Sequence, residues 1–344
     1  MSETFLVTGN CGYVGAVMTG FLKAHGHRVI GLDCGLYRGG FPDFEPVVDQ
    51  QVTKDIRQVN EADFDGVDVV VHLAALSNDP LGELAPTLTR DINTEASLRA
   101  AAFAKRAGVG RFLFASSCSI YGVAATEHAI DESGQLSPAT EYARSKVDVE
   151  AGLAALADRN FHPVFLRNAT VYGDSPCLRL DLVVNNLTAA GFTNGQVVVL
   201  SDGSPWRPIL HVEDMARAFL AAARAPVEVI HGQAYNVGQN RENYQVREIA
   251  QAVQEALPQC TVEIRATSSP DERTYRVDFG KIAQQLPAFN PQWTLRLGIE
   301  QLIHRFRHID LQPEQAQSPQ YYRVRWIRQL IEQGCLDRNL FLSA

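Results

Sequence analysis

The chain has 344 residues, which allows about two domains of ordinary size or one domain with a substantial lobe. Its formal net charge is −8 and neither end carries a basic run, so the charge excludes the basic surface typical of nucleic-acid or anionic-membrane binding. No apolar stretch approaches the roughly 18 residues of a membrane span, and no secretory signal precedes the first apolar run. The six cysteines have no Cys-x-x-Cys spacing, which indicates free thiols and no metal site. We expect a cytoplasmic protein.

The stretch from Phe5 to Gly15 is an apolar strand that leads into three glycines at three-residue spacing. Gly9 and Gly12 allow a tight turn and a close approach to a pyrophosphate, and Gly15 allows the next helix to pack closely. That helix should begin near Tyr13, where its free N–H groups favour an anion. The stretch predicts a nucleotide-binding turn.

A second strand from Arg28 to Leu32 ends in Asp33, at about the 20-residue separation from the first glycine that is expected of a ribose-binding acid. A carboxylate at this position accepts hydrogen bonds from a ribose 2′-hydroxyl and repels a 2′-phosphate. The pattern therefore favours NAD over NADP. The alternative interpretation is that Asp33 only ends a strand.

Further strands and helices follow in alternation. Strands are expected at 52–56, 67–73 and 109–115, and a helix at 94–107. Asp55 is a candidate adenine contact, and a solvated surface carboxylate explains it equally well. The small side chains of Ala74 and Ala75 leave room for a ligand. Alternation of this kind predicts an α/β fold with a Rossmann-type, doubly wound parallel sheet and ligands at the carboxyl ends of its strands.

A polar cluster from Ser116 to Gly122 follows the fifth expected strand, and Tyr142 and Lys146 lie four residues apart on the helix expected within 138–159. Residues at this spacing share a helix face. A nearby ammonium lowers the tyrosine pKa from about 10 toward working pH, where the phenol can exchange a proton with a substrate hydroxyl. The pair is a candidate acid–base centre.

In this order, the motifs resemble those of the extended short-chain dehydrogenase/reductases that act on nucleotide sugars, such as UDP-galactose 4-epimerase and dTDP-glucose 4,6-dehydratase. The resemblance runs from about residue 3 to residue 300. It implies a tightly held NAD that accepts hydride from a sugar carbon, commonly C4. It also implies that Tyr142 removes the hydroxyl proton, that Ser117 hydrogen-bonds the same hydroxyl, and that Lys146 holds the nicotinamide ribose. The cofactor-binding residues it implies are Gly9, Cys11, Gly12, Tyr13, Gly15, Asp33, Asp55, Ile56, Leu73, Ala74, Ala75, Tyr142 and Lys146.

The sequence departs from this family at the two residues after the catalytic serine. The 4,6-dehydratases have Asp and Glu there, an acid for the departing water and a base for the C5 proton, whereas this chain has Cys118 and Ser119. An unassisted serine hydroxyl cannot remove a C5 proton, so dehydration is disfavoured. Cys118 is a candidate catalytic acid or base, and the alternative is a small apolar filler.

The later part of the chain carries candidates for substrate binding. By resemblance these are Thr170, where the family often has asparagine, Asn186, Arg207 as a clamp on the diphosphate, and Arg273. His211 is interpreted as structural. We expect a NAD-binding domain at 1–172, to which 208–240 returns, a smaller C-terminal α/β substrate-binding lobe at 173–207 and 241–310, and a linker with a helical tail at 311–344.

The leading interpretation is an NAD-dependent nucleotide-sugar epimerase that oxidises the sugar transiently at C4. Three alternatives remain open: a C4 dehydrogenase or ketoreductase, then a 4,6-dehydratase, and from another class an NAD-sensing scaffold. The resemblance also implies a homodimer, formed through the helices near 94–107 and 141–158. The tail has room to dock on its own chain or on a second subunit.

Overall fold

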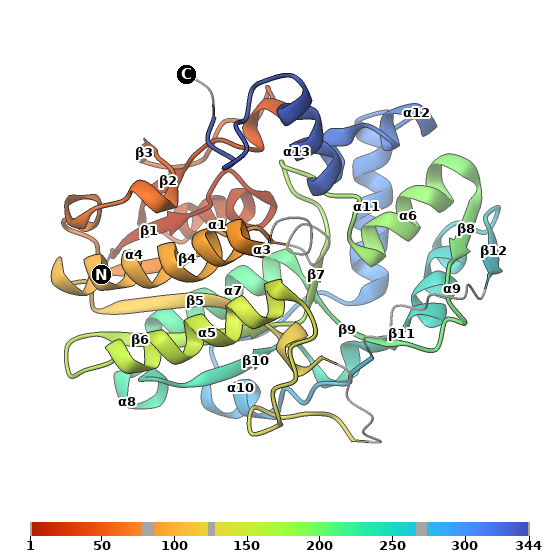
Figure 1. Ribbon diagram of the computed structural model, residues 1–344. Helices are drawn as coiled ribbons and strands as arrows, with labels where there is room; N and C mark the ends of the chain where they lie inside the picture. Colours follow the sequence, from red (N-terminus) through yellow and green to blue (C-terminus); the bar gives the residue numbers. More distant parts are fainter. Residues whose placement is uncertain (1, 78–85, 123–127, 266–273, 343–344) are drawn as a thin grey trace.

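The computed structural model describes residues 2–77, 86–122, 128–265 and 274–342 (Figure 1). A seven-stranded parallel sheet forms its centre, with the strand order β10-β6-β5-β4-β1-β2-β3. The sheet confirms the predicted Rossmann-type fold. Its strands are β1 (Thr4–Thr8), β2 (Arg28–Asp33), β3 (Gln50–Thr53), β4 (Val69–His72), β5 (Arg111–Ser117), β6 (His162–Asn168) and β10 (Ala234–Val237).

Helices cover both faces of the sheet because its strands are apolar on both sides. In β1, Phe5 and Val7 belong to one hydrophobic core and Leu6 belongs to the other. Helices α1 (Tyr13–Ala24) and α7 (Val212–Arg224) pack in the first core, and α4 (Ala96–Arg106) and α5 (Glu141–Leu156) pack in the second. The predicted crossover helix begins earlier than expected, as a π-helical turn, η4 (Arg90–Glu95).

A second region lies beyond β6. It contains a three-stranded sheet in the order β11-β9-β7 and a two-stranded sheet of β12 and β8, and the helices α6, α9 and α11 surround a third hydrophobic core. Helix α6 extends to Asn194, just before β8 begins at Gln196. The elements are β7 (Thr170–Tyr172), α6 (Val183–Asn194), β8 (Gln196–Val199), β9 (Trp206–His211), β11 (Asn243–Gln245), α9 (Val246–Ala256), β12 (Thr261–Ile264) and α11 (Leu295–His308).

The C-terminal segment folds back along the first region of the same chain. Helix α13 (Arg323–Glu332) places Trp326, Ile327 and Leu330 in the second hydrophobic core. The linker expected at the start of 311–344 contains one short helix, α12. The remaining elements are α3 (Pro86–Thr89), α8 (Val227–Ile230), α10 (Gly280–Gln285), α12 (Pro313–Ala316) and the 3-10 turns η1 (Arg38–Gly40), η2 (Ile56–Gln58), η3 (Glu61–Phe64), η5 (Cys118–Tyr121), η6 (Asn240–Glu242) and η7 (Pro319–Tyr321). Within the described ranges, every helix is too short or too polar to span a bilayer.

Candidate active site

A cavity of about 890 Å³ opens at the carboxyl ends of the central strands, where a doubly wound sheet binds its ligands. Most residues singled out in the sequence line it. Those that do are Gly9, Gly12, Tyr13, Gly15, Asp33, Asp55, Ile56, Leu73, Ala74, Ala75, Ser117, Tyr142, Lys146, Thr170, Asn186 and Arg207. The side chains of Cys11 and Cys118 are not part of the lining, and Arg273 lies outside the described residues.

The glycine turn leaves space for a backbone-bound ligand. Gly9 has a φ of +73°, and a Cβ there would lie 2.9 Å from the backbone nitrogen of Ala74. A Cβ on Gly15 would collide with the carbonyl oxygen of Gly9. Gly12 is the N-cap residue of α1 and provides no side-chain cap, and the first turn carries no acidic residue. The turn and helix therefore fit a dinucleotide diphosphate, as the glycine spacing predicts.

The Asp33 carboxylate is held at the end of β2 by backbone donors. The N–H of Cys11 donates to Oδ2 at 3.0 Å, and the N–H of Gly35 donates to Oδ1 at 2.7 Å. Burial raises the Asp33 pKa, and these two hydrogen bonds oppose that rise. Cys11 thus contributes its main chain to the turn, while its thiol lies in a small apolar cluster with Phe44 and Cys177.

The end of the cavity where the sequence predicts the adenosine, here called the adenosine end, is formed by the turn after β3. Asp55 caps this turn and holds the Arg57 guanidinium with hydrogen bonds of 2.9 and 2.8 Å. The guanidinium in turn stacks on Phe341, with 3.6 Å from its central carbon to the ring centroid, and donates to the carbonyl oxygen of Asn339 at 2.7 Å. The Asp55 carboxylate is therefore already engaged in holding the C-terminal segment.

The opposite end of the cavity contains the expected acid–base residues. Ser117 is the last residue of β5, and its Oγ accepts a hydrogen bond from the N–H of Ser119 at 3.2 Å. Lys146 donates to the carbonyl oxygen of Ala115 at 2.7 Å, and its Nζ lies 5.4 Å from the centroid of the Tyr142 ring. Burial lowers the Lys146 pKa to about 7. The structure brings Ser117, Tyr142 and Lys146 to one wall of the cavity.

Cys118 lies behind this wall. Its side chain is 0% exposed within the first hydrophobic core, and its thiol donates to the carbonyl oxygen of Arg167 at 3.1 Å. Burial raises the thiol pKa, which disfavours the thiolate. This position corresponds to the apolar-filler alternative for Cys118.

Two polar residues that the sequence analysis did not propose as site residues line the cavity near Ser117. The hydroxyl of Ser119 and the side-chain oxygen of Asn168 are buried and have no hydrogen-bond partner among the described residues. Buried polar atoms normally have partners, so each of these two oxygens has unused hydrogen-bonding capacity. Ser119 could have been suspected from its place two residues after Ser117, but its direction is set by the 3-10 turn.

The wall next to the second region contains the candidate substrate residues. Asn186 donates from Nδ2 to the carbonyl oxygen of Leu180 at 2.9 Å, and Arg207 donates to its neighbour, the carbonyl oxygen of Trp206, at 2.8 Å. Arg207 is mostly buried on β9, and Thr170 lies half-buried on the neighbouring strand β7, where it pairs with Ile209. The described residues thus place three of the four candidates around one cavity.

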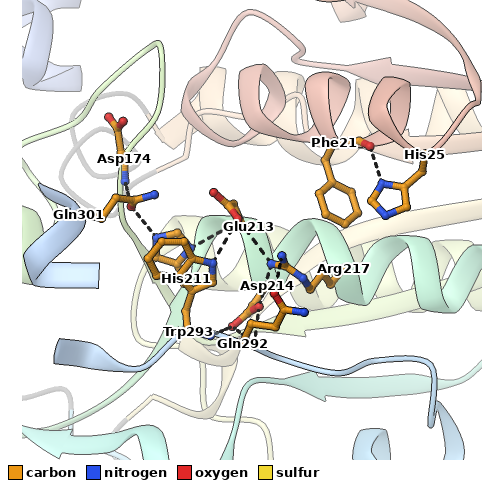
Figure 2. Close-up of polar contacts among 10 residues, drawn as sticks. All are labelled: Phe21, His25, Asp174, His211, Glu213, Asp214, Arg217, Gln292, Trp293 and Gln301. Carbon is orange, nitrogen blue, oxygen red and sulfur yellow. Dashed lines mark hydrogen bonds and ion pairs between the residues drawn. The ribbon is translucent and has the colours of Figure 1, made fainter. Parts of the chain in front are cut away.

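The junction of β9 and α7 supports the structural interpretation of His211. Figure 2 shows its ring stacked on Trp293, 3.8 Å between centroids, with Nε2 and the side-chain oxygen of Gln301 2.8 Å apart. Asp214 accepts hydrogen bonds from the N–H groups of Gln292 and Trp293. Burial lowers the His211 pKa to about 4, so the ring is neutral near pH 7. The histidine joins the two regions and does not line the cavity.

The fold and the cavity define a dinucleotide-binding protein of the doubly wound class. The profile described as the NAD dependent epimerase/dehydratase family matches residues 5–238, about two thirds of the chain. The chain therefore belongs to this family, whose members are NAD-dependent nucleotide-sugar enzymes. The resemblance proposed from the motifs is confirmed.

The relatives carry different activities. A UDP-glucose 4-epimerase of Mycolicibacterium smegmatis is 28% identical over 316 residues, which cover 88% of this chain and 98% of the relative. UDP-glucuronic acid decarboxylase 2 of Arabidopsis thaliana is 26% identical over 319 residues, covering 88% and 68%. A solved structure of MoeE5 in complex with UDP-glucose and NAD is 25% identical, with a TM-score of 0.77 and coverage of 89% and 99%. These similarities agree with the family assignment. Because the relatives differ in activity, the reaction of this chain has to be argued from its site residues.

Proposed function

We propose that this protein is an epimerase that acts on a nucleotide sugar through transient oxidation at C4. The observation that carries the proposal is the meeting of Ser117, Tyr142 and Lys146 on one cavity wall, without a carboxylate at either position after the serine. NAD, when bound, supplies the hydride acceptor and donor.

The chain's own residues handle the proton. In the proposed mechanism, the Tyr142 phenolate accepts the proton of the sugar hydroxyl and returns it after the sugar has been reduced on its other face. Ser117 hydrogen-bonds the same hydroxyl and orients it. The Lys146 ammonium stabilises the phenolate electrostatically, because its Nζ lies 5.4 Å from the tyrosine ring centroid inside a buried wall. Arg207 and Asn186 are proposed to bind the diphosphate of the sugar nucleotide.

Positions 118 and 119 support epimerisation over loss of water. Elimination of water across C5 and C6 requires a base at C5 and an acid at the leaving hydroxyl. The thiol of Cys118 lies in the core, and Ser119 offers only a hydroxyl to the cavity. The same wall can also support simple oxidation at C4, which would release reduced cofactor.

Product analysis distinguishes these reactions. Purified protein is incubated with UDP-, GDP-, CDP- and dTDP-sugars without added NAD, and the products are separated and weighed by mass spectrometry. A product of unchanged mass and altered retention is expected. A product lighter by one water would contradict the argument from positions 118 and 119, and a product lighter by two hydrogens, with reduced cofactor released, would identify a dehydrogenase.

A further inference from the structure

The C-terminal segment, residues 319–342, runs beside the region of β2 and β3 (Figure 1). Six of its residues line the cavity: Tyr322, Arg323, Val324, Arg325, Arg328 and Leu340. Trp326 donates from its indole N–H to the carbonyl oxygen of Leu36 at 2.9 Å, just after β2. Leu340 lines the cavity beside Ile56, and Arg57 is held between Asp55 and the segment. The cavity therefore has one wall made by a part of the chain that lies well beyond the residues matched by the family profile.

Arg323, at the start of α13, is the most deeply placed charged residue of this segment. It is 2% exposed and lines the cavity, and its guanidinium lies over the Tyr37 ring, 3.9 Å from the centroid. Its backbone N–H donates to Oδ2 of Asp181 at 3.2 Å. The Nη1 group of the side chain has no hydrogen-bond partner among the described residues. A buried guanidinium with an unused donor is costly unless an acceptor arrives, preferably an anionic one.

The carboxylates near Arg323 are engaged elsewhere. Asp181 accepts two hydrogen bonds from the side chain of Arg179, a second buried cation of the cavity wall, at 2.8 and 3.1 Å. Asp33 accepts from two backbone N–H groups. Burial and the nearby Arg179 lower the Arg323 pKa to about 10, which still leaves the guanidinium charged at neutral pH. The unused Nη1 donor of Arg323 would therefore be satisfied by an anionic acceptor bound in the cavity.

We propose that Arg323 donates to a phosphate oxygen of bound NAD, so that the C-terminal segment completes the cofactor site from outside the nucleotide-binding region. The diphosphate of a nucleotide is an anionic acceptor that suits this guanidinium. Two ligands could supply it, the dinucleotide and the sugar nucleotide. The ring contact with Tyr37, in the segment after β2, places Arg323 on the side of the cavity where the glycine turn is joined to Asp33 through the N–H of Cys11, and this position favours the dinucleotide. The inference requires NAD as cofactor and is independent of the sugar reaction.

The test compares Arg323→Met, which keeps the apolar stem, with Arg338→Met, an exposed arginine of the same segment that does not line the cavity. Dissociation constants for NAD and, separately, for UDP are measured by calorimetry on cofactor-depleted protein. Arg323→Met should weaken NAD binding about 10- to 100-fold, the range expected when a charge-assisted hydrogen bond is lost. Arg338→Met should leave it unchanged, and neither variant should alter UDP binding by more than about 2-fold.

Three outcomes would overturn the proposal: unchanged NAD affinity in Arg323→Met, an equal loss in Arg338→Met, or a loss confined to UDP. Thermal unfolding of the depleted proteins checks that the variants fold. If Arg323→Met does not fold, the neutral, polar Arg323→Gln decides by the same criteria. A failure to find epimerised sugars would leave the NAD measurement, and therefore this inference, unaffected.

Discussion

The two ends of the cavity use polar groups in different ways. One end contains Ser117, Tyr142 and Lys146 and is here called the reacting end. There, Ser119 and Asn168 have side-chain oxygens without a partner in the described part of the chain. At the adenosine end, Asp33 and Asp55 already accept hydrogen bonds from the protein, and Arg323 retains an unused donor. The two ends therefore differ in what they leave unpaired: side-chain oxygens near Ser117, and a guanidinium N–H at the end that carries Asp33 and Asp55.

The largest effect is expected from Tyr142→Phe, which removes the proposed acid–base group at the reacting end. Turnover should fall about 100- to 10,000-fold, because positioned general acid–base groups contribute on this scale. The amount of NAD bound per protein should not change. Steady-state rates and cofactor content measure both, with Tyr321→Phe, outside the cavity lining, as the matched control. Normal turnover in Tyr142→Phe would refute the proposed mechanism.

Gly15→Ala should weaken NAD binding and also destabilise the fold. Its new Cβ meets the main chain of Gly9, which cannot move as a flexible side chain can. We expect a loss of about 1–3 kcal/mol in unfolding free energy, typical of overpacking, together with weaker NAD binding. Gly20→Ala is the control on the same helix, because its Cβ would meet nothing within 4 Å. Denaturant titration and calorimetry measure the effects. Equal behaviour of the two variants would contradict the steric argument.

Short-range sequence patterns found most of the cavity. The glycine turn, Asp33 and the Tyr142–Lys146 pair could be predicted because each depends on spacing within one strand, turn or helix. Arg323 could not be predicted as a wall of the same cavity, since its place depends on a contact with Tyr37, nearly 290 positions earlier in the chain. The sheet could be predicted from the alternation of strands and helices. The early start of the crossover helix at η4 could not, because packing fixes where a helix begins.

Lys146 should make stability depend on pH at the reacting end. Its pKa is lowered from 10.5 to about 7 in the folded protein, so the unfolded chain binds more protons between these values. Stability contributed through this group therefore rises as pH increases from about 7 to 10. Lys146→Met removes this pH dependence. The unfolding free energy of the wild type should therefore rise by about 2 kcal/mol relative to that of Lys146→Met between pH 7 and pH 9.

Denaturant unfolding of wild type and Lys146→Met at both pH values, without NAD, measures this difference. Lys23→Met is the control, because Lys23 is a surface residue that pairs with Asp49. Its difference from wild type should stay constant over the same pH range. A constant difference for Lys146→Met as well would show that the buried lysine keeps an ordinary affinity for its proton.

The smallest effect on turnover is expected from Cys118→Ala. This variant can be compared with Ser119→Ala, because both residues belong to the turn η5. The thiol faces the core and bonds a backbone carbonyl, so its loss should lower the unfolding free energy by about 1 kcal/mol and leave turnover within about 2-fold. Ser119→Ala should lower turnover and leave the unfolding free energy nearly unchanged, because Ser119 lines the cavity and its hydroxyl has no partner in the described chain. Turnover and unfolding of both variants measure the effects. If Cys118→Ala abolished turnover while Ser119→Ala did not, the thiol would have to reach the substrate, and the turn after β5 would have to rearrange when the substrate binds.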